Sequence, residues 1–197
     1  MSWNLGTGGG SNAEFTKFPP GITKIRVLDE APHMRWTHWM NQHKRSLNCP
    51  GAGCPICQIR KGQKANKEQY TYPMTRRFTM NIFNYETGKV EIMEQGIGFF
   101  EDLRDLKVDT EAEGKKLSDV IIKVRRRGTG KDDTSYRLDI EGDATEELPE
   151  EGIIDLAQFF QPNTTEQITR LVNGEAWDEV FVREEQTEET EEHVEVR

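Results

Sequence analysis

Apolar and polar residues alternate along several short segments of this chain, and the alternation predicts β-strands. In the segment 23–28, Ile25 and Val27 alternate with polar or basic neighbours. Because successive side chains of a strand point to opposite faces, such a segment buries one face and exposes the other. The same kind of pattern predicts strands at 33–40, 43–48, 70–85, 90–94, 120–127 and 135–140.

Turn signals join the later strands into two hairpins. A Glu-Thr-Gly-Lys turn at 86–89 precedes the 90–94 strand, and a Gly-Thr-Gly turn at 128–130 precedes the 135–140 strand. Five or more short strands with few helices are typical of a small, partly open β-barrel. We therefore expect a mainly β protein.

Three further segments favour helices. Large apolar residues recur at helical spacing between 97 and 107, which predicts a short amphipathic helix. Residues 58–67 are polar, basic and compatible with a helix. One or two short helices are expected within 153–173, and the start signal is Asn163-Thr164-Thr165-Glu166.

Composition divides the chain of 197 residues into four parts. Hydrophobic residues make up 34%, below the 45–50% usual for globular chains, so a packed core does not extend over the whole length. We expect a flexible glycine-rich N-terminus at 1–19 and a folded core at 20–140. An acidic linker with short helices follows at 141–183, and a disordered acidic tail at 184–197.

The net charge of −9 hides two opposite halves. Residues 1–131 carry a balance of +8, whereas residues 132–197 carry −17. A basic body followed by an acidic tail is compatible with a nucleic-acid partner, although the overall charge argues against one. No apolar run reaches the length of a membrane span, and the first residues lack the pattern of a secretory signal. We therefore expect an intracellular protein with no membrane partner.

The three cysteines form a tight cluster, Cys49, Cys54 and Cys57. An odd number at this spacing is a poor disulfide framework, and a redox Cys-x2-Cys pair would not need the third thiol. Three thiolates within nine residues favour a tetrahedral zinc ion, which requires a fourth ligand. His38, His43 and His33 all lie upstream and are the candidates, in that order of preference.

The site is expected to be structural and not catalytic. A catalytic zinc keeps one position open for water and has a general acid or base nearby. Neither the His-x-Glu nor the His-Glu-x-x-His spacing occurs in the basic body of the chain, residues 1–131. We therefore expect a binding protein and not an enzyme.

Aromatic and basic residues are interleaved around the cysteine cluster and along 70–85. In the strand beginning at 76, Phe78, Met80 and Ile82 share a core-like face. The opposite face is polar, basic and aromatic, as single-stranded nucleic acid requires, because bases stack on rings and phosphates bind cations. The candidate contacts are Arg35, Trp36, Trp39, Lys44, Arg45, Arg60, Lys61, Lys64, Tyr70, Tyr72, Arg76, Arg77, Phe83 and Tyr85.

A second basic strip lies in the 120–127 strand. Val120, Ile122 and Val124 should face inward, because they alternate with basic residues. The strip is either a charged edge strand or a hairpin that contacts phosphates, and the adjacent Gly-Thr-Gly-Lys turn favours the second interpretation. Its candidate contacts are Lys123, Arg125, Arg126 and Arg127.

In this combination the chain resembles the single-stranded DNA-binding, or helix-destabilising, proteins of T-even-type phages. The resemblance covers roughly residues 20–140. The motifs that carry it are Cys54-Pro55-Ile56-Cys57-Gln58-Ile59, Asn66-Lys67-Glu68-Gln69-Tyr70, Arg76-Arg77-Phe78, Asn81-Ile82 and Gly88-Lys89-Val90, with a short helix after Gly98.

The resemblance implies an OB-fold, a five-stranded barrel, with an inserted zinc subdomain of one histidine and three cysteines. His38 then best matches the histidine ligand, and Tyr70, Tyr72, Phe83 and Tyr85 fall where the family places aromatic residues in its DNA cleft. It also implies a role in phage DNA replication, recombination and repair in the cytoplasm of the infected bacterium. The acidic tail would regulate DNA binding and recruit replication and recombination proteins. A zinc-ribbon transcription regulator or protein adaptor is the alternative.

Overall fold

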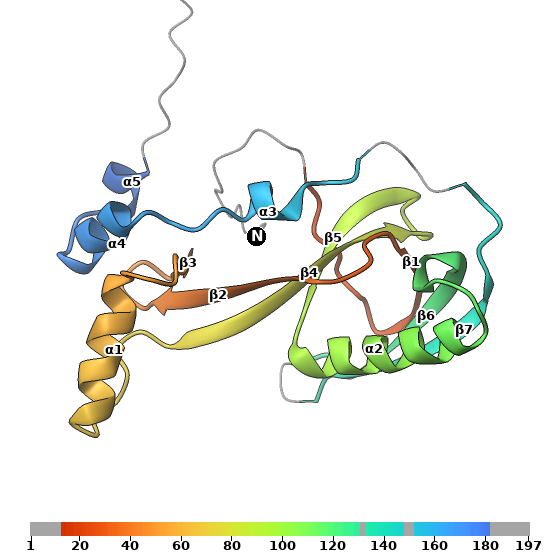
Figure 1. The fold of residues 1–197 in the computed structure, drawn as a ribbon, viewed down its shortest axis with the longest axis horizontal. Helices are drawn as coiled ribbons and strands as arrows, with labels where there is room; N and C mark the ends of the chain where they lie inside the picture. Colours follow the sequence, from red (N-terminus) through yellow and green to blue (C-terminus); the bar gives the residue numbers. More distant parts are fainter. Residues whose placement is uncertain (1–12, 131–132, 148–151, 182–197) are drawn as a thin grey trace, which may run out of the picture.

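A computed structural model describes residues 13–130, 133–147 and 152–181. The tail expected at 184–197 lies outside this range. The chain forms a mainly antiparallel sheet of seven strands with several helices, and each strand overlaps a segment predicted to be a strand. Figure 1 shows a larger lobe and a smaller lobe, which are joined by two long strands.

Five strands build the larger lobe. The strand β4 pairs with β1 and β5, and β1 also pairs with β6, which in turn pairs with β7. Among the described residues no pairing joins β5 to β7, so the curled sheet remains partly open. The bounds of these strands are β1 Gly21–Val27, β4 Met74–Asn84, β5 Lys89–Gln95, β6 Val120–Arg127 and β7 Ser135–Asp143.

The core of the larger lobe lies between the inner face of this sheet and the helix α2, Ile97–Ala112. Val120, Ile122 and Val124 are buried in this core, as their alternation predicted. The helix is longer than the predicted 97–107 and connects β5 to the short 3-10 helix at Leu117–Asp119.

The smaller lobe is an insertion between β1 and β4. It contains β2, His33–Met40, β3, Arg45–Asn48, and the helix α1, Pro55–Ala65. The helix starts three residues before the predicted segment because Cys54 is its N-cap and Pro55 opens the first turn. A proline costs little there, since its missing N–H would have had no partner inside the helix.

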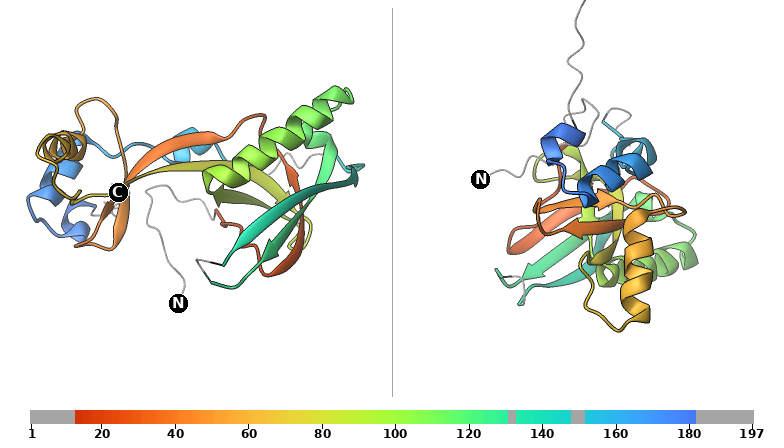
Figure 2. Two further views of the ribbon diagram at one scale, coloured as in Figure 1. Left: turned by 90° about the horizontal axis from the view of Figure 1, so that it is seen from below. Right: turned by 90° about the vertical axis from the view of Figure 1, so that its left-hand side faces the viewer.

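The segment after β7 returns across both lobes. Its helices are α3, Leu156–Phe159, α4, Thr165–Val172, and α5, Trp177–Val180. As Figure 2 shows, α3 lies over the larger lobe, whereas α4 and α5 lie on the smaller one. The start of α4 is the predicted one: the Thr164 side chain accepts a hydrogen bond from the Gln167 amide at 3.1 Å.

Two expectations about exposure are wrong. Residues 13–18, assigned to a flexible N-terminus, instead pack on the larger lobe: Thr16 and Phe18 are buried, and the Thr16 amide donates to the carbonyl of Ile92. The outer face of β4 is not open along its length, since Thr79 and Asn81 are 0% and 1% exposed.

The cover over the outer face of β4 comes from the C-terminal segment. The Asn81 side chain donates to the Ile154 carbonyl at 2.9 Å and accepts from the Ile154 amide at 3.1 Å. The Asn81 side chain thus makes with the backbone of this segment the pair of hydrogen bonds that a neighbouring strand would make. Beside it, Ile92 of β5 packs with Leu156 and Phe160 in a small separate core.

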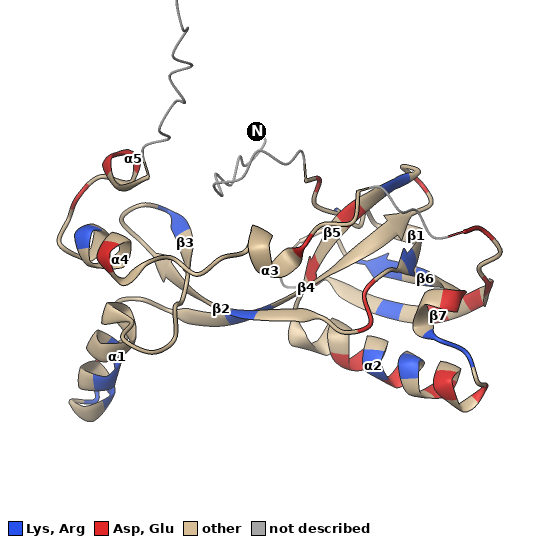
Figure 3. Cartoon of the chain, turned by 45° about the horizontal axis from the view of Figure 1, so that its top comes forward, with Lys and Arg blue, Asp and Glu red and all other residues tan. Residues whose placement is uncertain are grey.

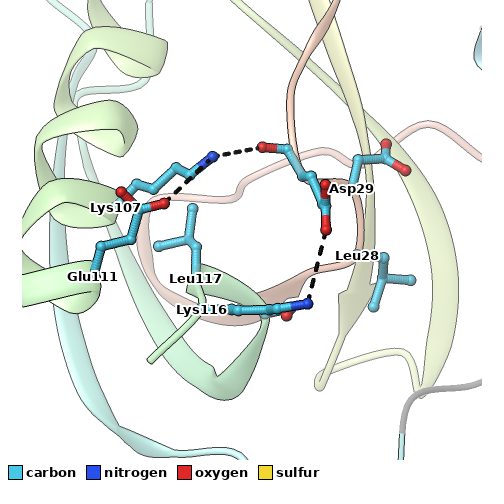
Figure 4. A pocket seen from close by; sticks show the side chains of 8 residues that line it. Leu28, Asp29, Lys107, Glu111, Lys116 and Leu117 are labelled. Atoms are coloured by element: carbon cyan, nitrogen blue, oxygen red, sulfur yellow. Dashed lines mark hydrogen bonds and ion pairs between the residues drawn. The ribbon is translucent and has the colours of Figure 1, made fainter. Parts of the chain in front are cut away.

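The connection between β1 and β2, where the chain leaves the larger lobe, is tied to α2. A cavity of about 180 Å³ lies at this point, and Figure 4 shows side chains that line it. Lys107 donates to the Glu30 carbonyl at 3.0 Å and lies 3.7 Å from the Glu111 carboxylate, while Lys116 lies 3.8 Å from that of Glu30. These charged side chains pair with one another, so the residues that line the cavity have a structural role.

Candidate functional site

One histidine and three cysteines meet in the smaller lobe. His38 comes from β2, Cys49 follows β3, and Cys54 and Cys57 lie at the start of α1. Their ligand atoms all lie within 4.8 Å of one another, and His38 and Cys54 are buried. The arrangement could hold one metal ion.

The spacing of the ligand atoms fits a tetrahedral ion of zinc's size. Zinc–sulfur bonds of about 2.3 Å and zinc–nitrogen bonds of about 2.0–2.1 Å place two sulfurs about 3.8 Å apart and a sulfur and a nitrogen about 3.6 Å apart. The Sγ atoms of Cys49 and Cys57 are separated by 3.6 Å. The Nε2 atom of His38 lies 3.5 Å from the Sγ atoms of both Cys54 and Cys57.

The loop between the first two cysteines has the backbone that this geometry needs. Gly51 and Gly53 adopt φ angles of 78° and 77°, a region that residues with a Cβ rarely enter. The turn lets the Gly51 amide donate to the Cys49 Sγ at 3.4 Å. The Pro-Gly-Ala-Gly filler between Cys49 and Cys54 is therefore part of the site.

Burial sets the protonation of the cluster in the absence of metal. It lowers the pKa of His38 to about 4, so the imidazole is neutral at pH 7 and its lone pair is available. It raises the pKa of Cys49 to about 12 and also raises that of Cys57. Thiolates at Cys49 and Cys57 would therefore need a nearby cation, and a bound metal ion would supply it.

The other candidate histidines lie elsewhere. The ring of His43 packs against Trp177 of α5 at 5.8 Å between centroids. The ring of His33 stacks on Phe160 at 6.1 Å. Of the three upstream histidines, His38 alone joins the cysteines.

An exposed aromatic face lies beside the cluster on the β2–β4 pair. Trp36 is two residues from His38 and so points from the same face of β2. Its neighbour in register on β4 is Arg76, whose guanidinium carbon lies 5.6 Å from the centre of the Trp36 ring and 5.2 Å from that of Phe78. Trp36 is 40% exposed. We call this surface, formed by Met34, Trp36, Met74, Arg76 and Phe78, the Trp36 face.

A second ring–arginine pair lies on the smaller lobe. Arg60 of α1 stacks over Tyr70, with 4.0 Å between the guanidinium carbon and the ring centre, and donates to the Tyr72 carbonyl at 2.7 Å. Tyr70 is 40% exposed. Lys61 and Lys64 are exposed on α1, and the basic positions of this helix are blue in Figure 3.

Other predicted contacts lie on the opposite side of β2 and β4. Arg35 is half-buried, stacks on Phe160 at 3.6 Å and is paired with Glu94, to which Arg77 also binds. Together with Trp39 they line a groove of about 490 Å³.

The remaining two contacts predicted near the cysteines lie close to α5. The Arg45 guanidinium lies over Trp177, and Lys44 is exposed beside it in the sequence.

Tyr72 does not reach the surface. It is 7% exposed and packs with Leu47 and Ile168 in the core of the smaller lobe. The expectation that its ring faces solvent is wrong, because Tyr72 belongs to this core.

The last six predicted contacts lie far along the chain, on the larger lobe. Phe83 and Tyr85 contact each other at 5.1 Å on the outer face of the sheet, where the Lys123, Arg125 and Arg127 side chains also point. Arg126 points to the other side, where it donates to the Phe18 carbonyl at 2.6 Å. The predicted set is therefore divided between separate surfaces.

Sequence reasoning did not single out Met34, Met74 or Phe78 as surface residues. Met34 and Met74 are 47% and 36% exposed, and Phe78 is half-buried. Their spacing of two residues from Trp36 or Arg76 was the signal that could have identified them.

No protein-family model matches this chain, and the search of curated proteins found no match. Among the residues that the structure describes, none of the helices has the length and apolar character required to cross a membrane.

Proposed function

We propose that this protein binds single-stranded DNA with little sequence preference, and that the Trp36 face is the centre of its binding surface. The observation that carries the proposal is the pairing of exposed rings with arginines: Trp36 with Arg76, and Tyr70 with Arg60. Bases stack on such rings, the guanidinium groups bind phosphates, and every base offers a π-face.

The connectivity of the larger lobe supports an OB-type barrel. Its first strand, β1, pairs with the second and the fourth, β4 and β6, and the second pairs with the third, β5. In this assignment α2 lies between the third and fourth strands, and the smaller lobe is an insertion between the first two. OB-folds use this connection and the faces of strands two and three to bind oligonucleotides.

In this proposal the metal is zinc and its role is structural. His38, Cys49, Cys54 and Cys57 would hold it, and four protein ligands leave no position for a reacting water. The ion would fix α1 against β2 and so set the position of Arg60 relative to Trp36. We infer a binding protein and not an enzyme.

The biological setting follows from the family resemblance. We propose a helix-destabilising protein of the T-even-phage type, which acts in DNA replication, recombination and repair in the cytoplasm of the infected bacterium. The acidic C-terminal residues, seven glutamates within 184–197, would regulate DNA binding and recruit replication proteins.

The test is a titration of labelled oligo-dT and of duplex DNA at two salt concentrations. The Trp36→Ala variant should bind oligo-dT about 5- to 150-fold more weakly, the loss of one stacked base at about 1–3 kcal/mol. Trp39→Ala is the matched control, because Trp39 is on the same strand but lines the groove on its opposite side. Equal or tighter binding of duplex by the unaltered protein would refute the proposal and favour a zinc-ribbon regulator.

A further inference from the structure

The outer face of β1, β6 and β7 carries cations that the fold places directly opposite one another. Arg125 of β6 is the register partner of Arg137 of β7, and Lys123 of β6 is the partner of Lys24 of β1. Like charges that face each other across strands are destabilising. The folded chain therefore bears an electrostatic cost on this face.

Carboxylates of β7 neutralise one cation of each like-charge pair. The Arg137 guanidinium binds Asp139 at 3.1 Å, and Lys24 binds Glu141 at 2.8 Å. Asp139 is in register with Lys123, but its carboxylate is directed to Arg137. Among the described residues, Lys123 and Arg125 have no carboxylate within ion-pair distance.

Lys123 and Arg125 belong to a regular row of three basic side chains on β6. Lys123, Arg125 and Arg127, which we call the β6 strip, alternate with inward-facing residues, so consecutive members lie about 6.7 Å apart along the strand. This interval is close to that of successive phosphates in an extended single strand. Phe83 and Tyr85 lie on the same outer face beside β1, since the Tyr85 amide donates to the Lys24 carbonyl at 3.0 Å.

We propose that the β6 strip is a second nucleic-acid site, which binds the phosphates of a strand that extends beyond the Trp36 face. The two surfaces are distinct, because one lies on the β2–β4 pair and the other on the outer side of the larger lobe. Bound phosphates would relieve the repulsion within the two like-charge pairs. The inference rests on the proposed function, since it concerns a longer segment of the same DNA.

The experiment compares two lengths of oligo-dT, with DNA in excess so that each strand carries at most one protein. A strand of about 8 nucleotides is within the site size of one OB-fold, whereas one of about 30 nucleotides can reach a second surface. The test variant is Lys123→Ala with Arg125→Ala. The control is Lys89→Ala with Lys115→Ala, which removes the same charge from two cations already paired with Glu14 and Asp143.

The test variant should bind the long strand about tenfold more weakly at low salt and the short strand within about twofold of the unaltered protein. The slope of log affinity against log salt should fall by about 1.4 for the long strand, because two phosphate contacts are lost. The control should change neither quantity for either length.

Three results would overturn the inference. One is an unchanged slope for the long strand, and another is an equal loss for both lengths. The third is the finding that a glutamate-rich peptide binds the strip of the unaltered protein, whereas the double substitution leaves DNA binding unchanged. Failure of the unaltered protein to bind even the short strand would instead refute the proposed function.

Discussion

The larger lobe buries fourteen residues in one continuous core, whereas the smaller lobe buries eight around the cysteine cluster. Three of those eight, Ile168, Leu171 and Val180, come from the C-terminal helices and not from the insertion itself. A short insertion has too little apolar surface to hold a fold alone, and metals commonly supply the difference. The two lobes should therefore respond differently to the same perturbation.

Loss of the proposed metal ion should have the largest effect and should separate the lobes most clearly. A structural zinc contributes about 10–16 kcal/mol in small zinc domains at pH 7. We expect a strong chelator, or His38→Gln, to unfold the smaller lobe while the larger lobe stays folded. Hydrogen exchange by mass spectrometry would locate the change, and metal analysis should find one ion per chain.

The control is His43→Gln, which changes a nearby histidine that packs on Trp177 instead of joining the cysteines. This variant should retain the metal, and the backbone amides of α1 should stay protected from hydrogen exchange. If the amides of both lobes lose protection together when the metal is chelated, the expected difference between the lobes is wrong.

A matched pair of core substitutions tests the same contrast without touching the ligands. Ile168 and Ile122 are both 0% exposed, one in the smaller core and one in the larger. Either change to alanine should cost about 2–5 kcal/mol through lost burial and the cavity left behind.

The difference lies in which amides respond. Ile168→Ala should raise hydrogen exchange in the smaller lobe alone, whereas Ile122→Ala should lower the denaturant midpoint of the main transition. Equal spread of exchange through both lobes in Ile168→Ala would show one cooperative unit.

The smallest of these effects should be the pH dependence of the metal-free smaller lobe. Because burial lowers the pKa of His38 to about 4, the neutral ring is favoured in the fold, and its contribution is complete above the ordinary pKa of 6.5. This contribution, up to about 3 kcal/mol, should be lost as the pH falls from 6.5 to about 4.

The thiols should act in the opposite direction. The raised pKa of Cys49, about 12, favours the protonated thiol, so its contribution is lost as the pH rises from 9.0 towards 12. The fluorescence of Trp39 and Trp177, measured as a function of pH in the presence of chelator, would follow both the acid and the alkaline loss of stability. A flat profile between pH 4 and 7, or the same acid limb in His38→Gln, would contradict this account.

Much of the fold could be read from local patterns, because each pattern is decided by neighbours in sequence. The alternation in 120–127 identified its buried face, and the signal at Asn163-Thr164-Thr165-Glu166 marked the start of α4. The cysteine spacing likewise identified three members of the cluster that could hold a metal ion, and His38 was the preferred fourth.

The predictions that were wrong concern features that depend on segments far apart in the sequence. Asn81 is buried where Ile154, 73 residues later, bonds its side chain, and Tyr72 is buried in a core to which α4 contributes Ile168 and Leu171. Alternation also shows which residues of one strand share a face, but not how the sheet curls. Nor does it show the register between strands, which places Trp36 beside Arg76 and so on the face of β4 opposite to that of Phe83.

The contribution of α4 to the smaller lobe has a consequence for the order in which the chain is completed on the ribosome. Cys57, the last ligand, is synthesised about 110 residues before Ile168, which corresponds to roughly 5–20 seconds of synthesis. During that time Met40, Leu47 and Ile56 lack the helix that covers them. A metal ion captured by the nascent chain would hold these side chains together until α4 arrives, and so limit aggregation before the protein is released.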